Sequence, residues 1–237
     1  MKTVPKKITK EFYDKSSYFS DFSPLFLNRK TRFQTYRIQK VLEIYTPKKT
    51  DRVLDLGCGW GTFSFMLAPS CKEVIGLDYS KKSIELCNRQ LKNNKKKYRN
   101  VRFVCRDAKD TGLKQNSLNV IISADLVEHV YPDDFEKIIK ECKRLLVKGG
   151  KLVIWTPSRS HFIEMLKNNN ILIEKDVSHV DYKSMDRIIE MLQKYKFSIE
   201  KSYYAESHLP FINGIERLFL PYIPLFRRRI AVLAQRN

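Results

Sequence analysis

The sequence lacks the marks of several broad classes of protein. No stretch approaches the ~18–20 consecutive apolar residues that a membrane-crossing helix needs. The basic residues at the start are not followed by an apolar run, so we expect no secretory signal and a cytoplasmic protein. The five cysteines have no C-x-x-C spacing, which argues against a zinc site or a disulfide framework and favours reduced, mostly buried thiols. They are Cys58, Cys71, Cys87, Cys105 and Cys142.

Acidic residues are scarce relative to basic ones, with 26 Asp and Glu against 45 Lys and Arg, a formal net charge of +19. Such a basic protein has raised affinity for nucleic acid, anionic lipid headgroups or phosphorylated substrates, and the excess does not choose among them. The densest basic run, residues 89–102, contains no acid. It follows a helical pattern and precedes a predicted strand, so we interpret it as a solvated connector.

Apolar residues are plentiful, at 43% of the 237, and their spacing predicts an α/β fold. There is no internal repeat and no Gly/Ser-rich linker. From residue 51 onward strands alternate with helices, which predicts a doubly wound, mostly parallel sheet over 51–237, preceded by a helical segment over 1–50. The predicted strands are 52–56, 73–77, 101–105, 118–123, 151–155, 197–203 and 229–234, and the predicted helices are 28–45, 62–67, 80–91, 132–146 and 184–195.

A glycine-rich loop, Asp55-Leu-Gly-Cys-Gly-Trp-Gly61, separates the first predicted strand from the helix that follows. Glycines tolerate positive φ and let a ligand approach the backbone, and the helix beyond them offers unpaired N–H groups. A dinucleotide site would have G-x-G-x-x-G, but the third glycine comes one place early and Thr62 stands where it is expected. The loop therefore argues against NAD.

Acidic residues follow the next two strands. Asp78 ends the second strand, where its carboxylate can accept both hydroxyls of a ribose. Asp107 and Ala108 follow the third strand, where they can meet the edge of an adenine. Together with the glycine loop, this placement predicts a nucleoside site at the carboxyl ends of the strands.

At this point the sequence resembles the class I S-adenosylmethionine (SAM)-dependent methyltransferases. Val53-Leu-Asp-Leu-Gly-Cys-Gly-Trp-Gly-Thr is similar to their first motif, and Leu126-Val-Glu-His and Leu146-Val-Lys-Gly-Gly match later ones, over about residues 51–203. The resemblance implies a seven-stranded sheet with its last strand antiparallel and SAM as cofactor. The cofactor-binding residues that it implies are Asp55, Gly57, Cys58, Gly59, Gly61, Thr62, Asp78, Tyr79, Asp107, Ala108 and Ala124.

Asp125, Glu128 and His129 stand at i, i+3 and i+4, so they could share one helical face and, with His179, hold a divalent cation. The pattern resembles the E-x-x-E-H motif of ubiquinone-pathway O-methyltransferases and small-RNA 2′-O-methyltransferases, with Asp125 in place of the first Glu. The alternative is a metal-free site in which His129 acts as general base beside Glu128. His161 and His208 are interpreted as ordinary surface or loop histidines.

The segment 205–227 interrupts the last two predicted strands. Within it the nine uncharged residues 218–226 run into Arg227-Arg228-Arg229, which resembles an interfacial membrane anchor. The alternative is a lid over the substrate pocket, and both readings stay open. Aromatic residues near the other end are expected to close an apolar acceptor cavity. They are Phe12, Tyr13, Tyr18, Phe19 and Phe22.

These observations favour a methyltransferase that modifies an oxygen of a lipophilic or lipid-linked small molecule near an anionic membrane surface. A first alternative is an RNA methyltransferase, suggested by the net charge of +19. It is less favoured because no RNA-reading module is recognisable in the sequence. A second alternative is a SAM-binding protein without catalytic activity.

Overall fold

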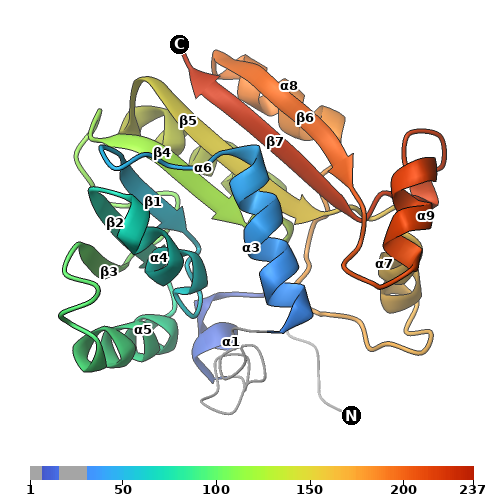
Figure 1. Ribbon diagram of the computed structural model, residues 1–237, viewed down its shortest axis with the longest axis horizontal. Coiled ribbons are helices and arrows are strands. Elements are labelled where there is room, and N and C mark those ends of the chain that lie inside the picture. The colour runs from blue at the N-terminus through green and yellow to red at the C-terminus, as the bar shows by residue number, and fades with distance from the viewer. Residues whose placement is uncertain (1–6, 16–30) are drawn as a thin grey trace.

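The computed structural model describes residues 7–15 and 31–237. These residues form a seven-stranded sheet, with helices on its faces as Figure 1 shows. The strand order is β3-β2-β1-β4-β5-β7-β6. Neighbouring strands are parallel from β3 to β5, whereas β7 runs antiparallel to both of its neighbours. The expected seven-stranded sheet with its last strand reversed is confirmed. The strands are β1 Arg52–Leu56, β2 Glu73–Asp78, β3 Val101–Cys105, β4 Leu118–Ala124, β5 Leu146–Pro157, β6 Phe197–Ala205 and β7 Arg229–Arg236.

Helices cover both faces of the sheet. Successive side chains of a strand point to opposite faces, so each strand has apolar side chains to bury on both sides. Leu54 and Leu56 pack with residues of α6 and α8, whereas Val53 packs with residues of α3 and α4. The helices are α1 Lys10–Lys15, α3 Arg32–Ile44, α4 Thr62–Leu67, α5 Lys81–Asn93, α6 Pro132–Leu145, α7 Phe162–Asn168, α8 Met185–Lys194 and α9 Ile212–Phe219. In the described part of the chain there are also three short 3₁₀ helices: η2 Ala68–Ser70, η3 Val127–His129 and η4 Pro224–Phe226.

The position of the ligand crevice follows from the strand order. The chain leaves β1 toward β2 and β3 on one side and later returns to place β4 on the other side of β1. In open α/β sheets, ligands bind beyond the carboxyl ends of the strands at such a reversal. The glycine loop after β1 and the segment after β4 both lie there.

The structure differs from the predicted elements in two places. The strand predicted over 151–155 begins at Leu146, directly after α6 ends at Leu145, so Gly149 and Gly150 lie inside β5. The pairing with β4 shifts register there, and Gly149 has a φ of +79°, as an irregularity in a strand requires. Helices α7 and α9 were not predicted, because both are short and lie where the strand–helix rhythm loosens.

Segment 1–50 is described only in part. Helix α3 buries Val41 and Ile44 in the same hydrophobic cluster as the sheet residues Val53 and Val120. The division of the chain at residue 50 remains a prediction.

Candidate functional site

The glycine loop turns back on β2 through its backbone. The N–H groups of Gly57 and Cys58 both donate to the carbonyl of Leu77, at 2.8 and 2.9 Å. Gly57 has a φ of +76°, and a Cβ there would stand 2.9 Å from Leu126 Cδ1. Only glycine therefore fits this turn, which exposes the loop backbone to the crevice.

Asp55 supplies the N-cap interactions that α4 would otherwise lack. The helix is preceded by Gly61, which has no side chain for capping. Asp55 Oδ2 accepts hydrogen bonds from the backbone N–H and the hydroxyl of Ser64, at 2.9 and 2.6 Å. Burial raises the pKa of Asp55 to about 6, although these hydrogen bonds oppose the shift. Asp55 thus fixes the glycine loop as well as facing the crevice.

Asp78 ends β2 with a buried carboxylate. Its Oδ2 accepts from the N–H of Gly59 at 3.0 Å, and its Oδ1 accepts from the N–H of Ser80 at 2.9 Å. Burial raises the pKa of Asp78 to about 6. Asp107, by contrast, is half-buried and accepts from the N–H of Lys109 at 2.9 Å.

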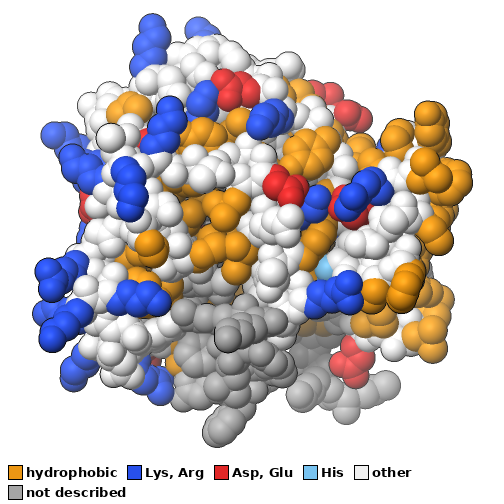
Figure 2. Space-filling view, viewed as in Figure 1, with side chains coloured by type: hydrophobic (Ala, Val, Ile, Leu, Met, Phe, Trp, Pro, Cys, Tyr) orange, Lys and Arg blue, Asp and Glu red, His pale blue; other side chains and the backbone are white. Residues whose placement is uncertain are grey.

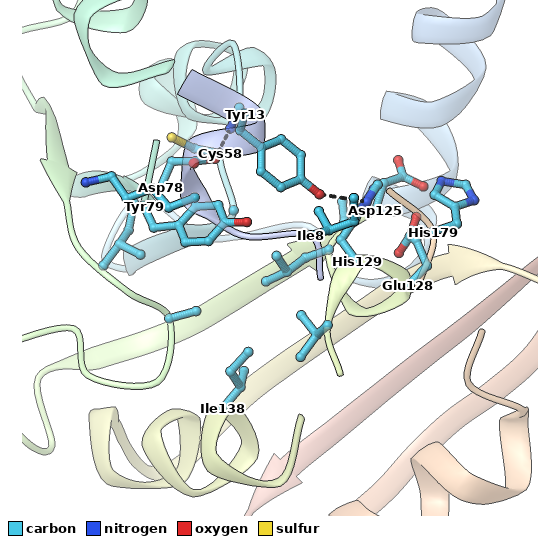
Figure 3. A pocket seen from close by; sticks show the side chains of 18 of the residues that line it. Ile8, Tyr13, Cys58, Asp78, Tyr79, Asp125, Glu128, His129, Ile138 and His179 are labelled. Carbon is cyan, nitrogen blue, oxygen red and sulfur yellow. Dashed lines mark hydrogen bonds between the residues drawn. The ribbon is translucent and has the colours of Figure 1, made fainter. Parts of the chain in front are cut away.

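A cavity of about 890 Å³ joins these residues to the segment after β4, within the size range of small-molecule sites. Figure 3 shows side chains from the glycine loop and the end of β2, and from the segment after β4, around this space. Gly61 does not line it, so the contribution of that glycine is to the turn. The predicted residues that line the cavity are Asp55, Gly57, Cys58, Gly59, Thr62, Asp78, Tyr79, Asp107, Ala108, Ala124, Asp125, Glu128, His129 and His179.

Helix α1 covers part of the cavity. The hydroxyl of Tyr13 lies 3.2 Å from His129 Nδ1, as the dashed line in Figure 3 marks. The hydroxyl of Ser80 donates to Asp14 at 2.7 Å, which holds the other side of α1 to the start of α5. Tyr13 therefore closes the cavity as expected, and Phe12 packs beside it. Three other aromatic residues of the prediction lie outside the described residues: Tyr18, Phe19 and Phe22.

Glu128, His129 and His179 come together at the end of the cavity nearest β5. One potential ligand atom from each lies within 4.8 Å of the others. Glu128 accepts from the hydroxyl of Thr156 at 2.9 Å, and burial together with the Asp125 carboxylate raises its pKa to about 8. Burial and the neighbouring His129 lower the pKa of His179 to about 4. A carboxyl group and two neutral imidazoles are a donor set suited to a divalent transition metal.

The expectation that Asp125 belongs to this cluster was wrong. Asp125 has a φ of +55° and precedes the single turn η3, so it does not share a helical face with Glu128. Its carboxylate forms ion pairs with Arg37 and with Arg229, the latter at 2.5 Å. Burial alone would raise the pKa of Asp125, but the two guanidinium groups outweigh it and hold that pKa below its ordinary value. Through these ion pairs Asp125 instead holds the segment after β4 to α3 and to β7.

Lys183 is a residue of the site that the sequence analysis missed. Its ammonium group is buried and donates to the carbonyls of Val127 and Val130, at the two ends of the turn that carries Glu128 and His129. An ion pair of 3.2 Å with Asp181 balances its charge. No sequence pattern signals this role, since Lys183 is one of many lysines.

His161 is not a surface residue, contrary to expectation. It is fully buried, its Nδ1 accepts from the N–H of Ile163 at the start of α7, and its Nε2 lies 2.9 Å from Glu216 of α9. Glu164 of α7 also forms a buried ion pair with Arg228. The two unpredicted helices are therefore joined by buried polar contacts. His208 is half-buried in a loop, against Phe33.

Comparison with known proteins assigns the chain to a family. A family model described as a methyltransferase domain matches residues 47–207. This chain belongs to that methyltransferase domain family. The ubiquinone biosynthesis O-methyltransferase of Pelagibacter ubique (strain HTCC1062) is 32% identical over 161 residues, which are 65% of this chain and 62% of that protein.

Solved structures agree with this fold. A SAM-dependent methyltransferase from Archaeoglobus fulgidus aligns with a TM-score of 0.67 at 20% identity, covering 91% of this chain and all of that one. The N-methyltransferase NodS from Bradyrhizobium japonicum WM9, in complex with S-adenosyl-L-homocysteine, aligns with a TM-score of 0.67 at 14% identity, covering 92% and 94%. The resemblance to class I SAM-dependent methyltransferases is confirmed, and with it SAM as the cofactor of the family.

Proposed function

We propose that this member of the family transfers the methyl group of SAM to a hydroxyl oxygen of a lipophilic acceptor. The observation that carries the proposal is one cavity that joins the glycine loop and Asp78 to Glu128, His129 and His179. A relative named for an O-methylation step in ubiquinone biosynthesis supports oxygen as the methylated atom.

The reaction needs placement of the acceptor and removal of one proton. The acceptor oxygen bonds to the methyl carbon, the C–S electron pair returns to sulfur to give S-adenosylhomocysteine, and the hydroxyl proton goes to a base. His129 Nδ1 lies 3.0 Å from the carbonyl of Ser178, which can only accept, so Nδ1 carries the proton and Nε2 the lone pair. Burial lowers the pKa of His129, which keeps it neutral and able to take the acceptor proton at neutral pH.

The alternative to His129 as a base is a divalent cation, which fits the donor set of Glu128, His129 and His179 and would occupy the Nε2 lone pair of His129. When bound, it would supply a positive charge that lowers the pKa of the acceptor hydroxyl. Glu128 would hold it as a carboxylate, so cation binding would release the proton that its raised pKa retains. Asp125 is outside this set, because two arginines already hold its carboxylate.

Methyl transfer from SAM to a series of alkylated phenols, followed by extraction of labelled product, tests the proposal. We expect His129→Gln to reduce kcat by about 100- to 10,000-fold, the usual contribution of a general base, while SAM affinity stays unchanged. Thr46→Ser, on the exposed end of the segment after α3, serves as the control variant. Methylation of oxygen that survives His129→Gln at full rate would contradict the assigned base, and absence of SAM binding to the wild type would contradict the whole proposal.

We also propose that the protein docks on an anionic membrane surface through α7 and α9. Within the described residues, the large hydrophobic side chains that are exposed gather in two stretches, 165–173 and 211–225, including Leu172 (94% exposed), Phe211 (91%) and Tyr222 (81%). Figure 2 shows hydrophobic side chains gathered at the side of the molecule where Figure 1 places α7 and α9. Arg217 lies within the second stretch and Arg227 follows it, and cations beside an apolar surface are typical of interfacial binding.

None of the helices in the described residues has the length and hydropathy that spanning a bilayer requires. Flotation with phosphatidylcholine vesicles, with and without phosphatidylglycerol, tests the proposed docking. We expect binding to the mixed vesicles and its loss in the double variant Phe211→Ser/Leu218→Ser. The double variant Lys95→Ser/Lys96→Ser removes two charges from the distant connector and is the control. Loss of binding in the lysine variant alone would favour general electrostatic attraction over docking through α9.

A further inference from the structure

A chain of hydrogen bonds joins His179 to Tyr182 and then to the buried carboxylate of Glu164, which also lines the cavity. His179 Nδ1 lies 2.7 Å from the hydroxyl oxygen of Tyr182, and that hydroxyl donates to Glu164 Oε2 at 2.8 Å. Glu164 is 1% exposed. Its other oxygen accepts from Arg228 and from Lys167, the latter at 3.4 Å. Neither Tyr182 nor Glu164 was assigned a role from the sequence.

The direction of each hydrogen bond follows from the charge on Glu164. A carboxylate paired with the Arg228 guanidinium is ionised and can only accept, so the Tyr182 proton must point to it. The Tyr182 oxygen then has only lone pairs left for His179. At 2.7 Å, His179 Nδ1 must therefore carry a proton and donate it, which leaves the lone pair of this imidazole on Nε2.

Asp176 is the group that would favour the other tautomer of His179, with the proton on Nε2. Its Oδ2 lies 3.6 Å from His179 Nε2, which is beyond hydrogen-bond distance. Its Oδ1 accepts from the N–H and hydroxyl of Ser178, at 2.9 and 2.5 Å, so Asp176 is held by the adjacent turn. The shorter contact with Tyr182 decides the tautomer as long as the Tyr182 hydroxyl is present.

We propose that Tyr182, oriented by Glu164, is a positioning residue that fixes His179 in the Nδ1–H tautomer and so reserves its Nε2 for chemistry in the cavity. The Ser178 carbonyl imposes the same tautomer on His129. Both imidazoles beside Glu128 then offer Nε2 either to a cation or to a proton. Outer partners of this kind commonly set the tautomer of a ligating histidine. The consequence for a cation rests on the function proposed above, whereas the tautomer itself does not.

Nitrogen-15 NMR of the imidazole groups in the full-length protein tests the proposal directly. We expect the wild type to show His129 and His179 protonated on Nδ1. His161 should be protonated on Nε2, because its Nδ1 accepts from Ile163 and its Nε2 faces Glu216. One spectrum thus contains both tautomers, and the substitution His179→Asn assigns the signal of interest. A wild-type His179 protonated on Nε2 would overturn the proposal without any further variant.

Tyr182→Phe should move the His179 proton to Nε2, facing Asp176, while the His161 signal stays in place and reports an intact fold. Tyr195→Phe is the matched control, since Tyr195 also donates to a glutamate, Glu136, but lies away from the cavity. A His179 signal unchanged by Tyr182→Phe would overturn the proposal.

Calorimetric titration with Mn²⁺, and with Co²⁺ followed by its absorption spectrum, separates the tautomer from the cation. We expect Tyr182→Phe to weaken the cation affinity roughly tenfold, at the lower end of the 10- to 100-fold effect of such partners, and Tyr195→Phe to leave it unchanged. If the wild type binds neither ion but shows the expected tautomers, the cation part of the proposed function fails and the role of Tyr182 stands. Equal cation affinity in wild type and Tyr182→Phe would contradict the positioning role.

Discussion

Asp78→Asn is the substitution that most directly tests where the nucleoside binds. The Asp78 carboxylate is 8% exposed and already accepts from Gly59 and Ser80. Two ribose hydroxyls would add two hydrogen bonds to the same charged group. Hydrogen bonds to a charged group contribute about 1.5–3 kcal/mol each, and the amide retains part of this. A loss of about 2–4 kcal/mol in total corresponds to a Kd for SAM about 30- to 1,000-fold higher.

The fold itself should tolerate this substitution. Burial raises the pKa of Asp78 to about 6, which means that the folded protein holds this charge at a cost. Removing the charge relieves that cost, while the new amide faces two N–H donors and loses a hydrogen bond. These effects oppose each other, so we expect the Tm without SAM to change by less than about 4 °C, the shift that roughly 1 kcal/mol produces in a domain of this size.

Isothermal titration with SAM and with S-adenosylhomocysteine measures the effect, with the exposed Asp186→Asn as control. The pH dependence gives a second readout. Only the ionised carboxylate accepts from both hydroxyls, so wild-type affinity should fall by up to tenfold per pH unit below about pH 6, and Asp78→Asn should lose this slope. Equal affinity of wild type and Asp78→Asn for both nucleosides would refute the placement of the ribose.

Three further predictions concern stability. Gly57→Ala adds a Cβ to a residue with a φ of +76° and places it 2.9 Å from Leu126 Cδ1. We expect the free energy of unfolding, measured with urea, to fall by about 1–2 kcal/mol and SAM binding to weaken. An unchanged unfolding midpoint would contradict the strained turn. Lys183→Met leaves the carbonyls of Val127 and Val130 without their buried donor, so the free energy of unfolding should fall by about 2–4 kcal/mol. The control Lys148→Met, at an exposed lysine, should change it little. Asp78 has a folded-state pKa of about 6 against an ordinary value of 3.8, so this group binds more protons in the folded protein than in the unfolded chain between about pH 4 and 6. The unfolding free energy of the wild type minus that of Asp78→Asn, which removes only this titration, should therefore fall as pH rises through about pH 5 to 6, by up to about 1.4 kcal/mol per unit, and a rise of that difference would contradict the shift.

The parts of the molecule that sequence predicts well are those set by short-range patterns. Every strand was placed to within a few residues, apart from the early start of β5, because buried strands read as apolar runs bounded by turns. The glycine loop and Asp78 were predicted for the same reason, since their spacing is fixed by a strand, a turn and a helix. Glu128 and His129 were found as neighbours in sequence, and His179 was proposed as a further ligand because it follows the fifth predicted strand.

What the sequence did not reveal depends on pairs of residues far apart in the chain. Asp125 was assigned to the cation cluster because helical spacing was assumed, but Arg37 and Arg229 hold it from 88 and 104 positions away. Lys183 supports η3 from more than fifty positions away. The buried pair of His161 and Glu216 joins the start of α7 to α9, two short helices that were not predicted. Such partners become visible only when the fold brings them together.

The two arginines also explain how Glu128 can differ so much from Asp125, three residues before it. Glu128 is fully buried and Asp125 is partly exposed, and Asp125 has two guanidinium partners whereas the side chain of Glu128 accepts from the neutral hydroxyl of Thr156. The pKa of Asp125 is therefore held low and that of Glu128 is raised to about 8, partly by the Asp125 charge itself. Neighbouring acids with separated pKa values are typical of functional sites. Asp125 thus acts as the permanent charge of this segment, and Glu128 as the group whose proton a cation would displace.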